Sequence, residues 1–319
     1  MKEPSNLLLK LSHRLFSDPS QQEKFMQALM HPQSFHPCIL WLKPKPFNLP
    51  FPVETAIAWQ PPFVDRLSLE VRPGQYSLHD QGYYYCLDFS SVFAASTLLA
   101  IPQPMSFVLD LCAAPGGKSL FAWKTLQPKL LLSNEVIGKR VGMLISNLKR
   151  CGIHPAVVLS LDPQVMAQLI PETIQVVLVD APCTGQSLLA KGGKAPGCFH
   201  PIAIKQNASR QKRILANAAR LVAPQGYLAY MTCAFSLEEN ERVSQWFLNR
   251  FPQFQPVSIS HLTAYQSHLS ALPCYRIWPQ DGLGAGAFTI LMQNTEGEQT
   301  HDIPADFLAH PSLKWSSSG

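Results

Sequence analysis

The sequence predicts an α/β fold: a doubly wound, mostly parallel sheet preceded by a small N-terminal α+β domain. Three observations support this prediction. From Phe107 onward, short apolar runs typical of buried strands alternate with segments of helical periodicity. Small residues at 113–117 join the first of these strands to a helix, as in nucleotide-binding α/β folds. Seven prolines between positions 37 and 62 exclude long helices from that stretch.

Length and composition describe an ordinary globular protein of 319 residues, with 46% hydrophobic residues and a mean hydropathy of +0.02. No apolar run is long enough to span a membrane, and the N-terminus lacks the features of a signal peptide, so we expect a cytoplasmic location. The eight cysteines include no C-x-x-C pair, which favours reduced thiols over disulfides or a metal site. The net charge of +5 permits a polyanionic partner without requiring one.

The N-terminal part begins with two short helices within residues 1–32. The first carries Leu7, Leu8, Leu11 and Leu15 on one face. The second begins at Pro19, after a capping Asp18, and ends before Pro32. We expect this pair to pack on the neighbouring domain rather than to bind a partner.

Three consecutive tyrosines, 83–85, follow the proline-rich stretch and precede an apolar helix at 92–99. Tyrosines in this position could stack on nucleic acid bases. We favour the alternative that they fill the seam between two domains.

The remaining chain alternates between strands and helices. The first elements expected are a strand at 107–111, a helix at 119–126, a strand at 129–133, a helix at 138–150 and a strand at 156–161. A strand at 176–179, an irregular segment at 184–200, a helix at 204–222 and a strand at 227–231 should follow. The last elements expected are a helix at 237–251 and a hairpin formed by 275–278 and 287–292.

The turn at 112–118 predicts a ligand site, since it presents backbone N–H groups at the start of a helix. It is not a G-x-G-x-x-G turn, which disfavours a dinucleotide. Carboxylates end four successive strands: Asp110, Glu135, Asp162 and Asp180. A carboxylate after the second strand suits a ribose diol, and a carboxylate after the third strand suits an adenine amino group. The series favours S-adenosylmethionine over four unrelated capping or solvated carboxylates.

Two cysteines also follow strands directly: Cys183 in DAPCTG and Cys233 in MTCA. Because strand ends meet at one edge of such a sheet, we expect both thiols near the methyl donor. A thiolate that adds to carbon 6 of cytosine makes carbon 5 nucleophilic toward a methyl group. This chemistry requires an ionised cysteine and a base removed from its stack.

The segments LDLCAAPGGKSL, NEVIGKR, DAPCTG and MTCAFSLEENE together resemble the Sun/Nop (RsmB/RsmF-like) family of RNA cytosine-5 methyltransferases, over about residues 75–295. The resemblance implies a class I S-adenosylmethionine-dependent methyltransferase fold, with a Rossmann-like seven-stranded sheet whose last strand is antiparallel. It implies a monomeric enzyme that acts on RNA, ribosomal rather than transfer RNA, through a covalent cysteine–C6 adduct. The domains expected are a substrate-binding helical and proline-rich domain at 1–95, a methyltransferase domain at 96–295 and a mobile polar tail at 296–319.

The resemblance also assigns site residues. The catalytic group is Cys233 as the nucleophile, Cys183 assisting product release, and Asp180 and Lys118 beside the target base. The cofactor-binding group is Cys112, Ala113, Ala114, Pro115, Gly116, Gly117 and Lys118 around the methionine part, Glu135 with Arg140 at the ribose, Asp162 at the adenine, and Asp180. No metal is expected.

The chain departs from the family at several positions. Thr184 and Ala234 replace the usual serines, so a hydrogen bond near Cys233 is expected to be missing. The segment 186–200 also differs from the family pattern. A basic cluster around it is expected either to contact RNA or to be a solvated face: Lys191, Lys194, Lys205, Arg210, Lys212 and Arg213. We expect Glu238, Glu239 and Asn240 to cap a helix and support the Cys233 loop.

Two alternatives belong to other functional classes. A non-catalytic RNA-binding or assembly factor that keeps the fold is suggested by Ala234 and the divergent segment, and opposed by the intact cysteines. A DNA cytosine methyltransferase would use Cys183 as the nucleophile, and the presence of Cys233 after threonine opposes it.

Overall fold

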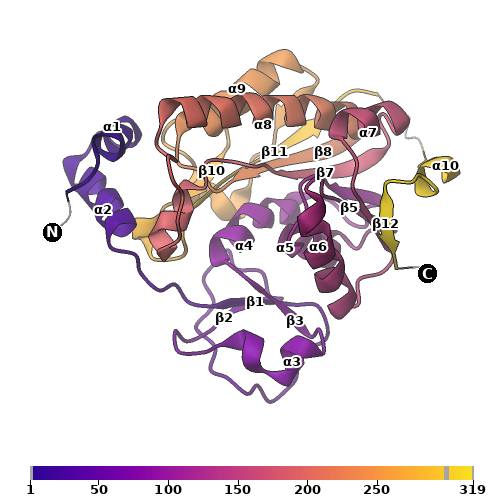
Figure 1. Ribbon diagram of the computed structural model, residues 1–319, viewed down its shortest axis with the longest axis horizontal. Coiled ribbons are helices and arrows are strands. Elements are labelled where there is room, and N and C mark those ends of the chain that lie inside the picture. The colour runs from indigo at the N-terminus through magenta and orange to yellow at the C-terminus, as the bar shows by residue number, and fades with distance from the viewer. Residues whose placement is uncertain (1–2, 298–301, 318–319) are drawn as a thin grey trace.

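A nine-stranded mixed sheet forms the centre of the protein, with helices on both faces (Figure 1). The structure is a computed structural model that describes residues 3–297 and 302–317. The strand order is β10-β11-β8-β7-β4-β5-β6-β12, and β9 pairs with β11. In chain order the strands are β4 (Phe107–Asp110), β5 (Leu130–Asn134), β6 (Ala156–Leu159), β7 (Ile174–Asp180), β8 (Val222–Thr232), β9 (Phe254–Pro256), β10 (Tyr275–Ile277), β11 (Ala287–Asn294) and β12 (Leu313–Ser316).

Seven of these strands form the predicted sheet. Strands β6, β5, β4, β7 and β8 are parallel, and β11 runs antiparallel to both β8 and β10. The prediction of seven strands with the last one antiparallel is therefore confirmed. The short strands β9 and β12 extend the sheet beyond it.

Helices cover both faces of the sheet in Figure 1. The face toward the small domain carries α4 (Phe89–Ala95), α5 (Gly117–Leu126) and α6 (Gly138–Arg150). The opposite face carries α7 (Pro163–Leu169), α8 (Pro201–Leu221) and α9 (Glu241–Arg250). Each face has its own apolar cluster, because parallel strands bury side chains on both sides.

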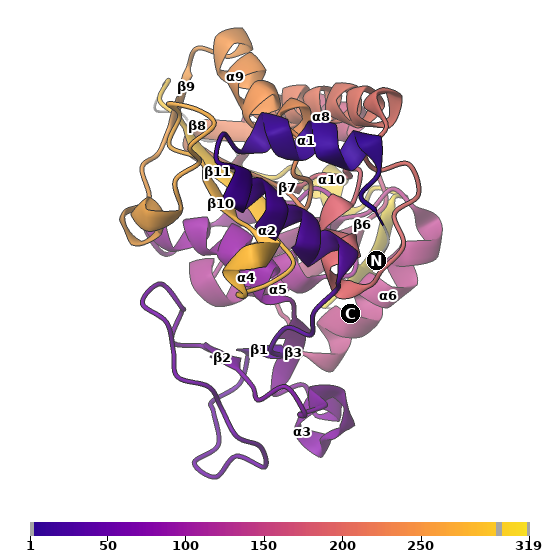
Figure 2. The ribbon, with the colours of Figure 1, turned by 90° about the vertical axis from the view of Figure 1, so that its left-hand side faces the viewer.

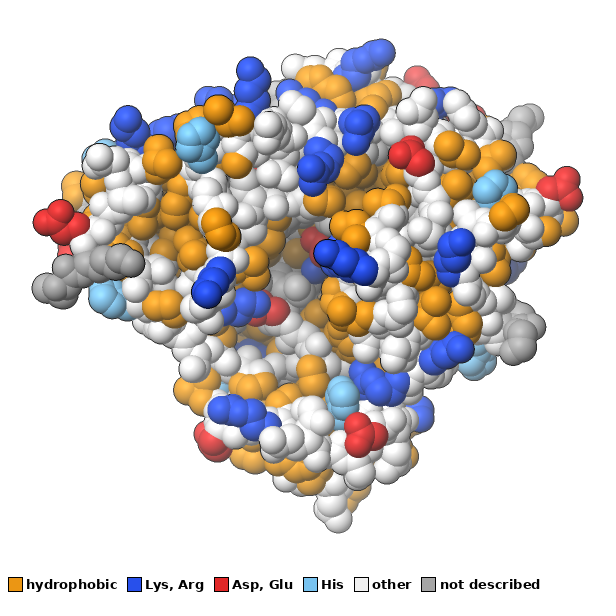
Figure 3. All heavy atoms as spheres, viewed as in Figure 1, with side chains coloured by type: hydrophobic (Ala, Val, Ile, Leu, Met, Phe, Trp, Pro, Cys, Tyr) orange, Lys and Arg blue, Asp and Glu red, His pale blue; other side chains and the backbone are white. Residues whose placement is uncertain are grey.

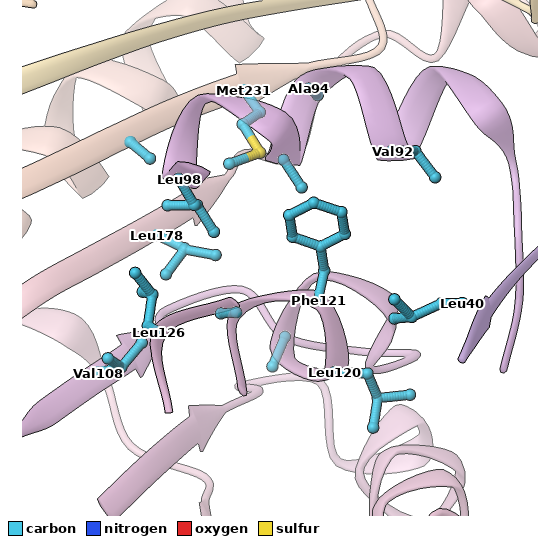
Figure 4. Packing of buried hydrophobic residues seen from close by; sticks show 14 of the residues in the cluster. Leu40, Val92, Ala94, Leu98, Val108, Leu120, Phe121, Leu126, Leu178 and Met231 are labelled. Atoms are coloured by element: carbon cyan, nitrogen blue, oxygen red, sulfur yellow. The ribbon is translucent and has the colours of Figure 1, made fainter. Parts of the chain in front are cut away.

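Figure 4 shows the first of these clusters. The ring of Phe121 on α5 points toward Val92 and Ala94 on α4, and Leu178 and Met231 reach it from the strands. Leu40, from the small N-terminal sheet, belongs to the same cluster. The small sheet is therefore joined to the large domain through a continuous apolar core.

The N-terminal part forms two separate units. A three-stranded antiparallel sheet contains β1 (Cys38–Trp41), β2 (Val64–Arg66) and β3 (Tyr84–Leu87), with α3 (Ser77–Asp80) beside it. Helices α1 (Asn6–Leu15) and α2 (Pro19–Met30) lie apart from it, in front of the large sheet in Figure 2. Their apolar faces pack on Phe235, Trp278 and Ala190 of the large domain, as predicted for this helix pair.

The domain boundary predicted after residue 95 falls within a continuous helical segment. Helix α4 continues into a 3-10 helix, η2 (Ser96–Ala100), and both contact β11 of the large sheet. Residues 89–100 therefore belong to the large domain. If the two parts of the chain separated within this apolar segment, its buried face would be exposed to water.

The tyrosine triplet is divided between two environments. Tyr84 is fully buried within the small domain, where its hydroxyl donates to the carbonyl of Pro73 at 2.7 Å. Its ring packs against Trp41 in a T-shaped arrangement. Tyr85 instead packs on the large domain. The predicted interdomain position is confirmed for Tyr85 and wrong for Tyr84, because strand alternation sends neighbouring side chains to opposite faces.

The prediction of a mobile tail at 296–319 is wrong for most of the described part. Residues 305–308 form α10 (Ala305–Leu308), and Phe307 is buried in the core. Strand β12 pairs antiparallel with β6. This pairing satisfies backbone groups that β6 would otherwise leave unpaired at the sheet edge, a contact that the polar composition of the segment did not indicate. Residues 298–301 and 318–319 lie outside the described part.

Two helix boundaries differ from the predictions for local reasons. Helix α8 begins at Pro201 because His200 accepts a hydrogen bond at its N-terminus. The helix expected at 237–251 is divided into a 3-10 turn, η4 (Leu237–Glu239), and α9, because Asn240 departs from helical geometry. None of the helices in residues 3–297 and 302–317 has the length and apolar character needed to cross a membrane.

Candidate active site

The carboxyl ends of β7 and β8 bring the two candidate cysteines together. These strands pair in parallel with Asp180 opposite Met231, so the segments that follow them leave the sheet side by side. The Sγ atoms of Cys183 and Cys233 lie 3.0 Å apart. Both thiols are free and partly exposed. The expectation that both lie at the same edge of the sheet is confirmed.

The two thiols have opposite pKa shifts. The hydrogen bond to Cys233, together with burial, raises the pKa of Cys183 well above its usual value. The same hydrogen bond lowers the pKa of Cys233, aided by the side chain of Ser187 and the ammonium of Lys118 and opposed by burial and Asp180. The contact therefore favours Cys183 as the protonated partner and makes Cys233 the more acidic of the two thiols.

The Cys233 loop is fixed from two sides. Asn240 accepts a hydrogen bond from the Thr232 hydroxyl at 2.5 Å and donates to the carbonyl of Ala234 at 2.8 Å. Gln186 accepts from the backbone N–H groups of Phe235 and Ser236, at 2.6 and 3.0 Å. The support expected from Asn240 is confirmed.

Ser187 adds a contact at the nucleophile itself. Its N–H donates to the carbonyl of Cys233 at 3.1 Å, and its hydroxyl contributes to the lowered pKa of the Cys233 thiol. Residue 234 offers no hydroxyl to Cys233, so the missing hydrogen bond expected from Ala234 stays a prediction. The hydroxyl that influences this thiol comes from Ser187 in the neighbouring loop.

Glu239 fixes the Cys183 loop. Its carboxylate accepts from the Thr184 N–H at 2.9 Å, from the Thr184 hydroxyl at 2.7 Å and from the Ser236 hydroxyl at 2.7 Å. Gln211 donates to the same carboxylate and to the carbonyl of Pro182. Burial raises the pKa of Glu239, although these hydrogen bonds oppose the shift. Glu239 thereby joins the two cysteine loops.

Lys118 and Asp180 form an ion pair beside the thiols. The ammonium of Lys118 lies 2.9 Å from Asp180 Oδ2 and 3.1 Å from the Ser91 hydroxyl. Burial alone would lower the pKa of Lys118, but Asp180 raises it above its usual value. Lys118 is only 9% exposed, whereas the Asp180 side chain is 36% exposed and can reach a substrate.

Figure 3 shows this face of the protein hollowed near its centre, with acidic and basic side chains at the edge of the hollow. The hollow lies between the large domain above and the three-stranded sheet below. A macromolecular substrate therefore has an open approach between the two parts of the molecule.

The turn between β4 and α5 is anchored to α6. Arg140 donates a hydrogen bond to the carbonyl of Ala114, and Asn147 donates to that of Pro115 at 2.9 Å. Gly116 has a φ of +116°, which side chains rarely adopt, and a Cβ at Gly117 would lie 2.6 Å from Leu87 Cδ1. The turn conformation therefore requires glycine at 116, and the packing of Leu87 from β3 favours glycine at 117.

Glu135 has the geometry of a ligand-binding carboxylate. It is 3% exposed, and its Oε1 accepts from the N–H of Ile137 at 2.9 Å. Its Oε2 lies 3.1 Å from the Arg140 guanidinium but accepts no hydrogen bond from any described residue. A buried carboxylate oxygen without a donor fits a ribose hydroxyl. The residues at the turn therefore fit a nucleoside cofactor.

The other strand-end carboxylates differ from one another. Asp162 is exposed and caps α7 by accepting from the N–H of Gln164 at 2.8 Å. Asp110 is fully buried and accepts from the Ser119 hydroxyl at 2.8 Å, and burial raises its pKa to about 7. Asp110 thus binds Ser119 at the start of α5 beneath the turn, which sets it apart from the other three strand-end carboxylates.

The structure divides the predicted basic cluster. Lys191 pairs with Asp88 at 2.9 Å. Lys205 and Lys212 lie on the face of α8 that is turned toward α1, whereas Arg210 and Arg213 are exposed elsewhere on that helix.

Several supporting residues escaped sequence reasoning. Gln186, Ser187 and Gln211 are buried polar residues that connect the cysteine loops. Arg276, buried on β10, binds Glu241 on α9 at 2.6 and 2.5 Å and donates to the carbonyl of Phe235. No local pattern marks these residues, because their partners lie far away in the chain. Among the described residues, no three His, Cys, Asp or Glu side chains gather as a metal site.

Comparisons with known proteins point to one family. A protein-family model described as 16S rRNA methyltransferase RsmB/F matches residues 96–293. Ribosomal RNA small subunit methyltransferase F of Cronobacter sakazakii is 32% identical over 203 residues, which cover 62% of this chain and 42% of that protein. The protein of the same name from Serratia proteamaculans is 28% identical over 256 residues, which cover 79% of this chain and 52% of that protein.

Solved structures confirm the fold. A structure titled methyltransferase homolog protein from Pyrococcus horikoshii superposes with a TM-score of 0.73 and 21% identity, covering 91% of this chain and 95% of that one. The chain spans about half the length of the curated relatives that it matches.

Proposed function

This chain belongs to the RsmB/F family of 16S rRNA methyltransferases, and on that premise we propose that it methylates carbon 5 of a cytidine in RNA. The observation that carries this proposal is the contact between Cys183 and Cys233, with Cys233 as the thiolate. A cysteine thiolate beside a nucleoside-binding turn suits covalent activation of a pyrimidine ring. The names of the relatives favour ribosomal over transfer RNA.

The cofactor of this family is S-adenosyl-L-methionine, which supplies the methyl group when bound. In this chain the turn from Cys112 to Lys118 would surround its methionine part. Glu135, held by Arg140, would accept from the ribose hydroxyls. Asp162 would receive the adenine amino group while still capping α7.

Cys233 performs the first step on the base. Its thiolate adds to carbon 6 of cytosine, a new C–S bond forms, and electron density moves toward carbon 5 and the ring. Cys183 holds the thiolate through its hydrogen bond before the attack. Asp180, oriented by Lys118, can hydrogen-bond the polar edge of the extruded ring.

Release of the product reverses the addition. A base takes the proton from carbon 5, the C5–C6 double bond re-forms, and the Cys233 sulfur leaves. The position of Cys183 beside Cys233 supports its role in this release step.

The experiment uses the full chain, S-adenosyl-L-methionine with a labelled methyl group, and ribosomal RNA from cells that lack the gene. We expect label at carbon 5 of cytosine, and label found solely at other positions would contradict the proposal. Cys183→Ala should accumulate a covalent protein–RNA adduct, whereas Cys233→Ala should form none. The reverse pattern would make Cys183 the nucleophile, as in the DNA methyltransferase alternative.

The non-catalytic alternative is tested separately. A scaffold that has lost turnover need not bind the cofactor, so calorimetry with S-adenosyl-L-methionine distinguishes it. The lowered pKa of Cys233 and its contact with Cys183 weigh against that alternative, since they favour a reactive thiol despite Ala234. We also propose a cytoplasmic location, which the eight free thiols support.

A further inference from the structure

A groove between α1 and α8 is not used by the proposed chemistry. It encloses a cavity of about 570 Å³. Leu7 and Leu11 of α1 and Ile204 of α8 line it, as do Lys10, Lys205 and Lys212. The ammonium of Lys212 lies 5.3 Å from the centre of the Trp246 ring. We call this surface the α1–α8 groove.

The groove is strongly basic. Its lining includes five Lys and Arg side chains and one acidic residue, Glu238. That carboxylate is shared between Arg14 and Arg242. The three lysines therefore leave an uncompensated positive charge around an apolar surface.

The groove adjoins the reaction centre through η4. Glu238 of this turn lies in the groove, and the next residue, Glu239, holds Thr184 beside Cys183. Helix α8 contributes to both places as well, since Lys205 and Lys212 line the groove and Gln211 contacts the Cys183 loop. Figure 3 shows Lys and Arg side chains along the upper left of the face that bears the central hollow, where Figure 1 places α1 and α8.

We propose that the α1–α8 groove binds a single-stranded segment of the substrate RNA next to the target cytidine. The lysines of the rim contact its phosphates, and the apolar surface receives an unstacked base. This inference rests on the proposed function for its ligand class. Lysine ammonium groups suit phosphates as point charges, and unstacked bases need apolar surface, so the combination fits RNA. Helix α8 lines the groove and also supports the Cys183 loop through Gln211, which favours the RNA substrate over an acidic partner protein.

The test measures binding without methyl transfer. A fluorescein-labelled, single-stranded 20-nucleotide RNA that contains cytidines is titrated with the full chain carrying Cys233→Ala, at several salt concentrations. The same titration is repeated after adding Lys205→Glu and Lys212→Glu together. The matched control is Lys129→Glu. Lys129 is exposed and precedes β5, at the amino ends of the parallel strands, whereas the cysteine loops follow their carboxyl ends.

We expect the double variant to bind the RNA at least about tenfold more weakly at moderate salt, and the control to bind normally. Each phosphate contact on a single strand contributes about 0.7 to the slope of log affinity against log salt, so the slope should fall by about 1.4. A second pair, Lys205→Gln with Lys212→Gln, removes the charge without reversing it and should give the same change in slope. Thermal unfolding checks that both pairs remain folded.

If the double variants bound the RNA with the same affinity and the same salt slope as the control, the proposal would be overturned. An acidic protein would then be the occupant that fits the groove. A chain that binds RNA in this groove but methylates no cytosine would overturn the proposed function alone. The two proposals can therefore fail independently.

Discussion

The Sγ atom of Cys183 lies 3.0 Å from the Sγ atom of Cys233, although 50 positions separate them in the chain. The contact makes the two thiols unequal: the pKa of Cys183 is raised and that of Cys233 is lowered. A neutral thiol that donates to a thiolate is a suitable resting state for a nucleophile that must later leave. The first prediction follows directly from this pair.

Replacing Cys183 by alanine should raise the pKa of Cys233, because the strongest stabiliser of its thiolate is lost. The measurement is the pH dependence of Cys233 alkylation by iodoacetamide, followed by mass spectrometry of the peptide. The midpoint should move to higher pH. Cys274→Ala, at a buried cysteine away from the pair, serves as the control, and an unchanged midpoint in Cys183→Ala would contradict the assignment.

Ser187→Ala should raise the same pKa by a smaller amount. The hydroxyl that helps lower the pKa of Cys233 is removed, while the bond from the backbone N–H of residue 187 to the Cys233 carbonyl can remain. The alkylation midpoint should therefore move to higher pH, by less than in Cys183→Ala. Ser258→Ala, at an exposed serine, should leave the midpoint in place.

Glu135→Gln should weaken the binding of S-adenosyl-L-methionine, since the ribose would lose a charged acceptor and Arg140 its partner. We expect a loss of about tenfold or more in calorimetric affinity. Glu172→Gln changes an exposed carboxylate at the amino edge of the sheet and should bind the cofactor normally. If Glu135→Gln and Glu172→Gln bound the cofactor with equal affinity, Glu135 would not belong to the cofactor site.

Arg276→Met should destabilise the protein by about 3–5 kcal/mol, because it leaves the buried Glu241 carboxylate without its partner. Adding Glu241→Leu should recover much of this loss. Burial alone would raise the pKa of Glu241, but Arg276 lowers it below the usual value. The pair therefore stabilises the fold above the normal pKa of glutamate, and this contribution disappears as the pH falls through the lowered value. Urea unfolding of both variants measures these effects.

Asp110→Asn should alter how stability depends on pH. Burial raises the pKa of Asp110 to about 7, so the folded chain holds this proton more tightly than the unfolded chain. The stabilisation is complete below about pH 4 and is lost as the pH rises through about 7. Asparagine cannot ionise, so the variant should gain stability relative to the parent between pH 5 and 8. Urea unfolding measures the free energy of unfolding of both proteins at each pH. If the difference between the variant and the parent did not change from pH 5 to 8, Asp110 would be charged in the folded protein.

Much of the fold could be predicted because it depends on local pattern. The apolar run at 107–109 and the glycines at 116 and 117 specify a buried strand and a tight turn whatever surrounds them. The polar segment at 302–317 could not be assigned in this way. Its strand exists because the edge of β6 offers unpaired backbone groups, and that edge is a property of the assembled sheet.

The sequence by itself determined that two cysteines follow strands of one sheet and that a nucleoside-binding turn begins that sheet, because strand ends and glycine turns are visible in short segments. Only the tertiary structure decided that the two thiols touch, that the pKa of Cys233 is the lowered one of the pair, and that Glu239 joins the two loops. These contacts depend on the register of β7 against β8, which places residues about 50 positions apart within hydrogen-bond distance.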